Sequence, residues 1–275
     1  MTYSEICKRL AAAGVESPSY EAALLLEHFC SVPREEIPFR RNEELFSPEL
    51  SAAVEKREKR YPLQYIIGEW DFCGESYKVG EGCLIPRSET ELLVMRACEL
   101  LPRGARFLDL CTGSGCIAVS VLKRRSDCTA VGVDVSERAL RYASENARRN
   151  RVDDMISFTE TDILDPSSAE KLFAGEGFSA ILSNPPYIKR GAAAELEPEL
   201  SFEPSLALFG GDDGMVFYRA IVSGFLPYVM SGGFALFEIG YDLGKDMRDI
   251  CARYGFDCKV EKDLAGLDRL AYISL

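Results

Sequence analysis

From Thr90 to the C-terminus, strand-like and helix-like segments alternate regularly, and this alternation constrains the fold more than any other feature of the sequence. The strand-like segments, short and rich in apolar residues, are 105–111, 129–135, 155–162, 178–184 and 232–240. The helix-like segments, with apolar residues at helical spacing, are 114–125, 136–150, 215–226 and 244–255. Such alternation predicts an α/β fold with a mostly parallel sheet and helices on both faces. The segments 256–264 and 269–275 have no helix between them and predict an antiparallel hairpin at the C-terminal edge of the sheet.

The residues before Thr90 follow a different pattern. Apolar residues recur at i, i+3 and i+4 in 4–14, 19–32 and 47–60, which predicts a small helical domain over 1–62. Alternating apolar and polar residues around glycine-containing turns then predict a linking β-hairpin within 63–88. The alternating α/β region forms the third part, at 89–275.

Composition limits the possible partners and location of the chain. Hydrophobic residues make up 47% and charged residues 28%, as in soluble globular proteins. No apolar run approaches the ~20 residues of a membrane span, and charges fall within the first ten residues, so we expect a cytoplasmic protein without a membrane partner. The net charge of −12 (32 basic against 44 acidic residues) lacks the basic footprint of proteins that grip nucleic acid.

The ten cysteines are scattered, without a C-x-x-C pair, and fall mostly in apolar segments, which is typical of reduced thiols that pack as small hydrophobic groups. The one histidine, His28, lies in a helical pattern, so we expect no metal site.

A candidate nucleotide site lies at the junction of the first strand and its helix, in the run Asp109-Leu-Cys-Thr-Gly-Ser-Gly. Gly113 and Gly115 permit a tight turn and close approach of a ligand, and the helix that follows offers unpaired N–H groups. Asp134 stands 19 residues after Gly115, at the end of the second strand, where a carboxylate can accept two ribose hydroxyls. The spacing Gly113-x-Gly115-x-x-Ala118 also fits a dinucleotide fingerprint, so an NAD-dependent dehydrogenase and a plain tight turn both stay open at this point.

The tetrapeptide Asn184-Pro185-Pro186-Tyr187 follows the fourth strand, at the carboxyl edge where open α/β sheets place their sites. It resembles the [DNS]-P-P-[YFW] motif of S-adenosylmethionine-dependent methyltransferases that act on planar nitrogens. The order of glycine loop, ribose acid and tetrapeptide also resembles the class I methyltransferase (Rossmann-like) fold. In that fold, Asp162 matches a position beside the adenine of the cofactor.

The tetrapeptide suits a planar amide nitrogen, whose delocalised lone pair makes it a poor nucleophile. The Asn184 side-chain oxygen and the Pro185 carbonyl can each accept one N–H, while Tyr187 packs on the flat face of the substrate. Holding the nitrogen near a methyl donor can supply much of the acceleration in such a transfer.

Longer segments resemble the peptide chain release factor N5-glutamine methyltransferases, the HemK/PrmC family. They are PLQYIIGEWDFCGESYKVGEGCLIPRSETELLV at 62–94, SNPPYI, FEPSLALFGGDDGMVFYR at 202–219 and GGFALFEIG at 232–240. The resemblance covers most of 60–240 and implies a helical N-terminal domain that recognises substrate. It implies that S-adenosylmethionine is the cofactor, with S-adenosylhomocysteine as product, and that release factors are the partners. The reaction implied is methylation of the glutamine in their Gly-Gly-Gln motif, which makes translation termination more efficient.

The same resemblance implies roles for individual residues. The cofactor-binding positions would be Asp109, Cys111, Thr112, Gly113, Ser114, Gly115, Asp134, Asp162, Ile163 and Asn184. Asn184, Pro185, Pro186 and Tyr187 would hold the target glutamine. Arg87, Glu89 and Glu203 would shape the site, although a salt bridge or helix cap explains them equally well.

Three positions depart from the family pattern. Cys111 stands where glycine is usual and adds a Cβ beside the cofactor loop, Ser88 replaces a proline, and Ile163 stands where some members carry an aromatic residue.

Two alternatives remain at this stage: an adenine-N6 methyltransferase acting on DNA or RNA, and a catalytically silent binding module. The first lacks an evident nucleic-acid domain, and the intact Asp134 and tetrapeptide weigh against the second. We expect a monomer.

Overall fold

The computed structural model describes residues 1–175 and 177–275, which form two compact units. The first unit contains Met1–Glu69 together with Glu197–Phe202, and the second contains Trp70–Leu196 and Glu203–Leu275. The short segment 197–202 therefore belongs to the N-terminal unit although it lies far along the chain.

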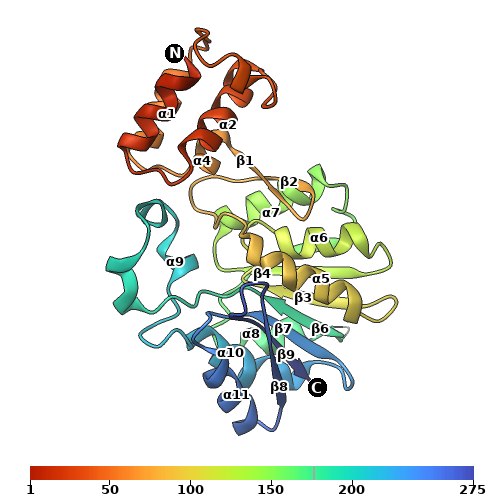
Figure 1. The fold of residues 1–275 in the computed structure, drawn as a ribbon. Helices are drawn as coiled ribbons and strands as arrows, with labels where there is room; N and C mark the ends of the chain where they lie inside the picture. The colour runs from red at the N-terminus through yellow and green to blue at the C-terminus, as the bar shows by residue number, and fades with distance from the viewer. Residues whose placement is uncertain (176) are drawn as a thin grey trace. The chain divides into compact units, whose positions relative to one another are not determined.

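A mixed sheet organises the second unit (Figure 1). In the described residues this sheet has seven strands in the order β5-β4-β3-β6-β7-β9-β8. Their bounds are β3 (Arg106–Leu110), β4 (Thr129–Asp134), β5 (Ile156–Glu160), β6 (Ala180–Ser183), β7 (Phe234–Glu238), β8 (Asp257–Lys262) and β9 (Asp268–Ser274). Strands β3 to β7 pair in parallel, and β9 pairs antiparallel with both β7 and β8. The predicted α/β fold with a mostly parallel sheet and an antiparallel C-terminal hairpin is confirmed.

Within that hairpin, β9 lies inside the sheet and β8 forms its edge. The apolar sequence of β9 suits burial between two neighbours, whereas the charged residues of β8 suit an edge exposed to water.

Helices cover both faces of the sheet because alternate strand residues point to opposite sides. They are α5 (Glu91–Leu100), α6 (Cys116–Arg124), α7 (Glu137–Arg149), α8 (Ser168–Leu172), α10 (Val216–Gly224) and α11 (Gly244–Arg253). Phe107 packs in one core cluster with residues of α5 and α6, and the adjacent Leu108 packs in the other with residues of α10 and α11. Short helices η2 (Ser88–Thr90), η3 (Arg190–Glu195), α9 (Ser205–Leu208) and η5 (Leu226–Tyr228) complete the unit.

Helix α8 was not predicted. Because β5 and β6 are parallel strands of one sheet, the chain must cross over between them. The helix in this crossover has five residues, too few to show a clear apolar period.

The hairpin before the sheet consists of β1 (Glu69–Phe72) and β2 (Glu75–Lys78). Cys73 and Gly74 both have positive φ, as a tight two-residue turn of type I′ requires. The strands are shorter than the alternating sequence indicated, because 63–67 forms the helix α4 (Leu63–Ile67), which ends at Gly68 in a left-handed conformation.

The N-terminal unit is built from α1 (Tyr3–Ala12), α2 (Pro18–Cys30), η1 (Ile37–Phe39), α3 (Leu50–Glu58), α4 and η4 (Pro198–Phe202). Its core contains the fully buried Ile6, Leu10, Leu25 and Leu26. No helix among the described residues is long and apolar enough to cross a membrane.

One buried charge connects three segments of the N-terminal unit. The side chain of Arg57 in α3 is 5% exposed and forms ion pairs with Glu21 of α2 and with Glu199 of η4. Arg60 also binds Glu199, with Nε 2.6 Å from Oε1. Removing the central cation would leave two largely buried carboxylates without full compensation.

We therefore expect Arg57→Met to lower the free energy of unfolding by about 3 kcal/mol. Lys59→Met, at the residue that directly follows α3, removes an exposed cation and should change the free energy of unfolding by less than about 0.5 kcal/mol. Urea denaturation of the full chain, followed by circular dichroism, compares the two variants. Equal losses of unfolding free energy in the two variants would show that the buried ion pairs of Arg57 stabilise the protein no more than an exposed cation does.

Candidate functional site

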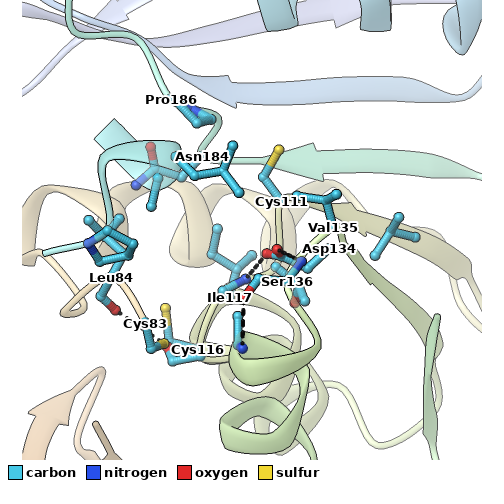
Figure 2. A pocket seen from close by; sticks show the side chains of 18 of the residues that line it. Cys83, Leu84, Cys111, Cys116, Ile117, Asp134, Val135, Ser136, Asn184 and Pro186 are labelled. Atoms are coloured by element: carbon cyan, nitrogen blue, oxygen red, sulfur yellow. Dashed lines mark hydrogen bonds between the residues drawn. The ribbon is translucent and has the colours of Figure 1, made fainter. Parts of the chain in front are cut away.

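A cavity lies at the carboxyl ends of the central parallel strands, and all of its lining residues belong to the second unit (Figure 2). Ten of the residues singled out from the sequence line this cavity: Arg87, Cys111, Thr112, Gly113, Ser114, Asp134, Asp162, Ile163, Asn184 and Pro186. The others do not line it; they are Glu89, Asp109, Gly115, Pro185, Tyr187 and Glu203. The structure thus brings the glycine loop, the second-strand acid and the tetrapeptide to one cavity.

The glycine loop is tied to the neighbouring strand by two hydrogen bonds. The Thr112 N–H donates to the Val133 carbonyl at 3.0 Å, and the Gly113 N–H donates to Asp134 Oδ2 at 2.9 Å. Gly113 has φ +55, a conformation that glycine adopts without a Cβ penalty.

Gly115 is required for a different reason, the close approach of two helices. It has φ +78 and immediately precedes α6. A Cβ at this position would lie 3.1 Å from the Cβ of Ala143 on α7 and 3.2 Å from its Cα. Any larger residue would therefore push the start of α6 away from α7.

Cys111 occupies a left-handed conformation, with φ +58. A residue with a Cβ pays a conformational cost there that glycine does not. Its side chain lines the cavity, and burial raises the pKa of the thiol well above its usual value. The thiol is therefore a neutral, weakly polar group beside the loop.

Asp109 supports the loop from beneath. It is fully buried, and its Oδ2 accepts hydrogen bonds from the Thr112 hydroxyl at 2.6 Å and from the Ala118 N–H at 3.2 Å. Burial raises the pKa of Asp109 to about 7, although both hydrogen bonds favour the ionised form. Its Oδ1 has no hydrogen-bond partner among the described residues. The geometry shows Asp109 holding the loop, without contact with the cavity.

Two carboxylates line the cavity itself, those of Asp134 and Asp162. Asp134 Oδ1 accepts the Ser136 N–H at 2.9 Å, and Oδ2 accepts the Gly113 N–H. Burial raises the pKa of Asp134, and these N–H donors oppose the rise. Asp162 Oδ1 accepts the Leu164 N–H at 2.8 Å. Because a carboxylate offers about four lone-pair positions, both can still accept hydrogen bonds from a ligand.

The residue that follows the tetrapeptide, Ile188, ties the chain to the end of α9 and the loop after it through two backbone hydrogen bonds. The Ile188 N–H donates to the Leu208 carbonyl, and the Gly210 N–H donates to the Ile188 carbonyl, both at 2.9 Å. A Cβ at Gly210 would lie 2.5 Å from the Pro186 carbonyl oxygen, and one at Gly214 would lie 2.5 Å from that of Tyr187. These two glycines therefore allow the loop 209–214 to pack directly on the tetrapeptide.

Two residues outside the predicted set contact its side chains. Asn184 Nδ2 donates to the Thr90 hydroxyl at 3.1 Å, and the Thr90 hydroxyl donates to Glu238 Oε2 at 2.5 Å. The Tyr187 hydroxyl donates to Glu238 Oε1 at 3.3 Å. Glu238 is 2% exposed at the end of β7, and burial raises its pKa.

The sequence contains a weak indication of each of these two residues, but neither indication identifies it as part of the site. Glu238 is the one charged residue in the apolar run FALFEIG, and Thr90 follows Glu89 in RSET. The pairing itself joins positions 148 residues apart and required the fold.

Of the three residues expected to shape the site, Arg87 and Glu203 contact each other, whereas Glu89 contacts its neighbour Ser88. Glu203 Oε2 accepts the Ile85 N–H at 3.0 Å, and its other oxygen pairs with Arg87, which lines the cavity. Glu89 accepts a hydrogen bond from the adjacent Ser88 hydroxyl at 3.0 Å. The structure thus joins Arg87 and Glu203 in a salt bridge that fixes one wall of the cavity.

The chemistry of the cavity can be read from its walls. A backbone loop without side-chain bulk at Gly113 and two carboxylates suit a ligand with several hydroxyl or amino donors. Ile117, Ile163 and Val135 offer apolar surface to a flat ring. Asn184 offers amide hydrogen bonding at the same cavity.

Two family models match the chain. The first is described as the PrmC N-terminal domain and matches residues 2–68. The second is described as the methyltransferase small domain and matches residues 88–199.

Curated relatives match most of the chain. The release factor glutamine methyltransferase of Thermodesulfovibrio yellowstonii is 42% identical over 227 residues, which cover 80% of this chain and 79% of that protein. The protein of the same name from Geobacter sulfurreducens is 36% identical over 266 residues, covering 95% of this chain and 91% of that protein.

Among solved structures, a methyltransferase from Pyrococcus furiosus superposes with a TM-score of 0.53 at 19% identity. The match covers 72% of this chain and 87% of that chain. At this identity the likeness concerns the fold alone.

The close approach at Gly115 leads to a test. Gly115→Ala and Gly104→Ala both place a Cβ at positive φ, but the Cβ at Gly104 would meet nothing within 4 Å. Both variants should lose about 1 kcal/mol of stability to backbone strain, and Gly115→Ala should lose about 1–3 kcal/mol more from overpacking against Ala143. Urea denaturation measures both, and equal losses would contradict the contact.

Proposed function

The chain belongs to the release factor glutamine methyltransferase family, and from that premise we propose the reaction that it catalyses. It transfers a methyl group from S-adenosylmethionine to the amide nitrogen N5 of the glutamine in the Gly-Gly-Gln motif of a release factor. The observation that carries the proposal is that Asn184 and Pro186 border the same cavity as the glycine loop and Asp134. A cofactor site and an amide-binding motif therefore meet where a transfer between them is possible.

The residues present fit S-adenosylmethionine. Asp134 retains lone pairs for ribose hydroxyls after accepting two backbone N–H groups, and each charge-assisted bond contributes about 1.5–3 kcal/mol. Ile163 and Ile117 would contact the adenine ring, and Asp162 its edge. Thr112, Gly113 and Ser114 would surround the amino acid part, while Asp109 would hold their loop in place. When bound, the cofactor supplies an electrophilic methyl group on a sulfonium ion.

The tetrapeptide would hold the other reactant. Asn184 Oδ1 and the Pro185 carbonyl each accept one N–H of the glutamine amide, which restrains its nitrogen and favours lone-pair density out of the amide plane. Tyr187 packs on the flat face of this amide. Arg87 and Glu203 maintain the cavity wall through their salt bridge. The main contribution of the chain is positioning, which can lower the barrier of a two-body transfer by several kcal/mol.

We also propose that the protein works as a cytoplasmic monomer on a protein substrate. The net charge of −12 supports a protein rather than a nucleic-acid substrate, because phosphate backbones favour basic surfaces.

Labelling with S-adenosylmethionine that carries a radioactive methyl group tests the reaction. We expect label in a purified release factor, none in its variant with asparagine in place of the Gly-Gly-Gln glutamine, and none in oligonucleotides. Label in adenine-containing oligonucleotides but not in the release factor would overturn the proposal in favour of an adenine-N6 methyltransferase.

The two halves of the site should respond differently to substitution. Asn184→Ala should lower kcat by about 100-fold or more while it leaves the Kd for S-adenosylhomocysteine within about threefold. Asp134→Ala should weaken that Kd by about 10- to 100-fold, because two charge-assisted hydrogen bonds to the ribose are lost. Isothermal titration calorimetry measures the Kd for S-adenosylhomocysteine, and initial rates at saturating substrate measure kcat. Small and similar effects of both substitutions would mean that the reaction occurs elsewhere.

A further inference from the structure

The proposed reaction requires the Asn184 side chain in one of its two amide orientations. An amide has an acceptor oxygen and a donor NH2 of nearly equal shape, and rotation by 180° exchanges them. Only the oxygen can accept an N–H from a glutamine amide, whereas the NH2 would place donor against donor. Some feature of the protein must therefore fix the rotation of this side chain.

The structure provides such a feature in Thr90 and Glu238. Asn184 Nδ2 lies 3.1 Å from Thr90 Oγ1, which lies 2.5 Å from Glu238 Oε2. Thr90 and Glu238 are each 2% exposed, so water does not compete freely for these groups. Thr90 is the last residue of η2, Glu238 is the last residue of β7, and Asn184 directly follows β6.

The direction of the hydrogen bonds follows from Glu238. An ionised carboxylate can only accept, so the single hydroxyl proton of Thr90 is directed to Oε2. With its proton directed to Glu238, Thr90 Oγ1 can act toward Asn184 only as an acceptor. The atom of Asn184 that faces it must therefore be the donor. Nδ2 must then face Thr90, and Oδ1, the other in-plane atom of the planar amide, is turned away from Thr90.

We propose that Thr90 and Glu238 are positioning residues that set the amide orientation of Asn184, through a relay in which an ionised carboxylate fixes a hydroxyl and the hydroxyl fixes the amide. This inference rests on the proposed function, because it concerns how Asn184 receives the substrate N–H. Neither residue touches the reacting atoms, and both act through Asn184.

The same carboxylate also holds Tyr187. Its Oε1 accepts the Tyr187 hydroxyl at 3.3 Å, so one buried group restrains both side chains of the tetrapeptide. This explains a charge at the end of an otherwise apolar strand, where an unpaired carboxylate would be costly.

Protonation of Glu238 would reverse the relay. A carboxylic acid can donate to Thr90 Oγ1, which frees the Thr90 proton to bind Asn184 Oδ1 and turns the amide to the wrong orientation. Burial raises the pKa of Glu238, and the nearby charge of Glu89 adds to the rise. Hydrogen bonds from Thr90 and Tyr187 and the positive charge of Arg269 oppose it. Two further titratable groups interact with Glu238: the Tyr218 hydroxyl, which donates to the Glu238 backbone carbonyl at 2.7 Å, and the Cys116 thiol.

A matched pair at Thr90 tests the relay. Thr90→Ser keeps the hydroxyl, and Thr90→Val keeps the shape but removes it. Thr90→Val should lower kcat for release-factor methylation by about 10- to 100-fold, with the Kd for S-adenosylhomocysteine within about threefold of wild type. Thr90→Ser should retain kcat within about threefold. Thr129→Val, an exposed exchange of the same type on β4, controls for the loss of a threonine.

The outcomes separate this inference from the function beneath it. If the wild-type enzyme does not label the release factor, the proposed function fails. If it does, and Thr90→Val matches wild type or Thr90→Ser falls as far as Thr90→Val, the relay is wrong.

A second measurement does not depend on the folding of Thr90→Val. At saturating cofactor and substrate, wild-type kcat should fall as the pH decreases through the raised pKa of Glu238. Glu238→Gln can still accept the Thr90 proton but cannot be protonated in this range. The acid fall in kcat should therefore become less steep, without disappearing, because Asp109, whose raised pKa is about 7, still titrates there. An unchanged acid limb in Glu238→Gln would overturn the relay.

Discussion

The parallel pairing of β3 with both β4 and β6 is the constraint on which the site depends. In the register of these pairs, Leu110 stands opposite Val133 on one side and Ser183 on the other. The next residue of each strand segment, Cys111, Asp134 and Asn184, therefore emerges at the same level of the sheet edge. A slip of one residue would turn every side chain of a strand to the opposite face, which the two buried cores forbid. The burial of Phe107 and Leu108 on opposite faces thus also fixes the alignment of the cavity.

Three carboxylates that are largely removed from water lie around this edge of the sheet. Asp109, Asp134 and Glu238 all have raised pKa values because they are removed from water, yet each accepts hydrogen bonds from hydroxyl or backbone N–H groups. Such carboxylates have tasks that a surface acid could not perform. Asp109 holds the glycine loop, Asp134 faces the cavity, and Glu238 directs two side chains. Of the three, only Asp134 lines the cavity, where Asp162 is the second carboxylate, so ligand contacts fall to these two and support of the site to Asp109 and Glu238.

The sequence predicted the fold, and it predicted that the glycine loop, Asp134 and the tetrapeptide meet at one edge of the sheet, because both predictions depend on local patterns. Strand and helix periods, the glycine loop and the tetrapeptide can each be read within a few residues, and parallel connectivity then brings their ends together. The insertion of β9 beside β7 and the helix α8 could not be read, because strand order and a five-residue helix leave little periodic trace. Thr90 and Glu238 were missed because their importance arises from a contact between distant segments. The resemblance implies a cofactor-binding position for Asp109, and the structure adds what the sequence could not show, that its carboxylate accepts hydrogen bonds from Thr112 and Ala118 within the loop and helix.

The two prolines of the tetrapeptide do not by themselves determine its chemistry. They restrict the backbone, but the position of that backbone depends on Gly210 and Gly214, which admit the neighbouring loop to van der Waals contact. The side-chain orientation in turn depends on Thr90 and Glu238. Without hydrogen bonds from residues outside the motif, the Asn184 amide could present either its oxygen or its NH2 group to a ligand. It follows that the same four residues in another protein, without a buried acceptor two hydrogen bonds away, need not select the same orientation or bind the same nitrogen.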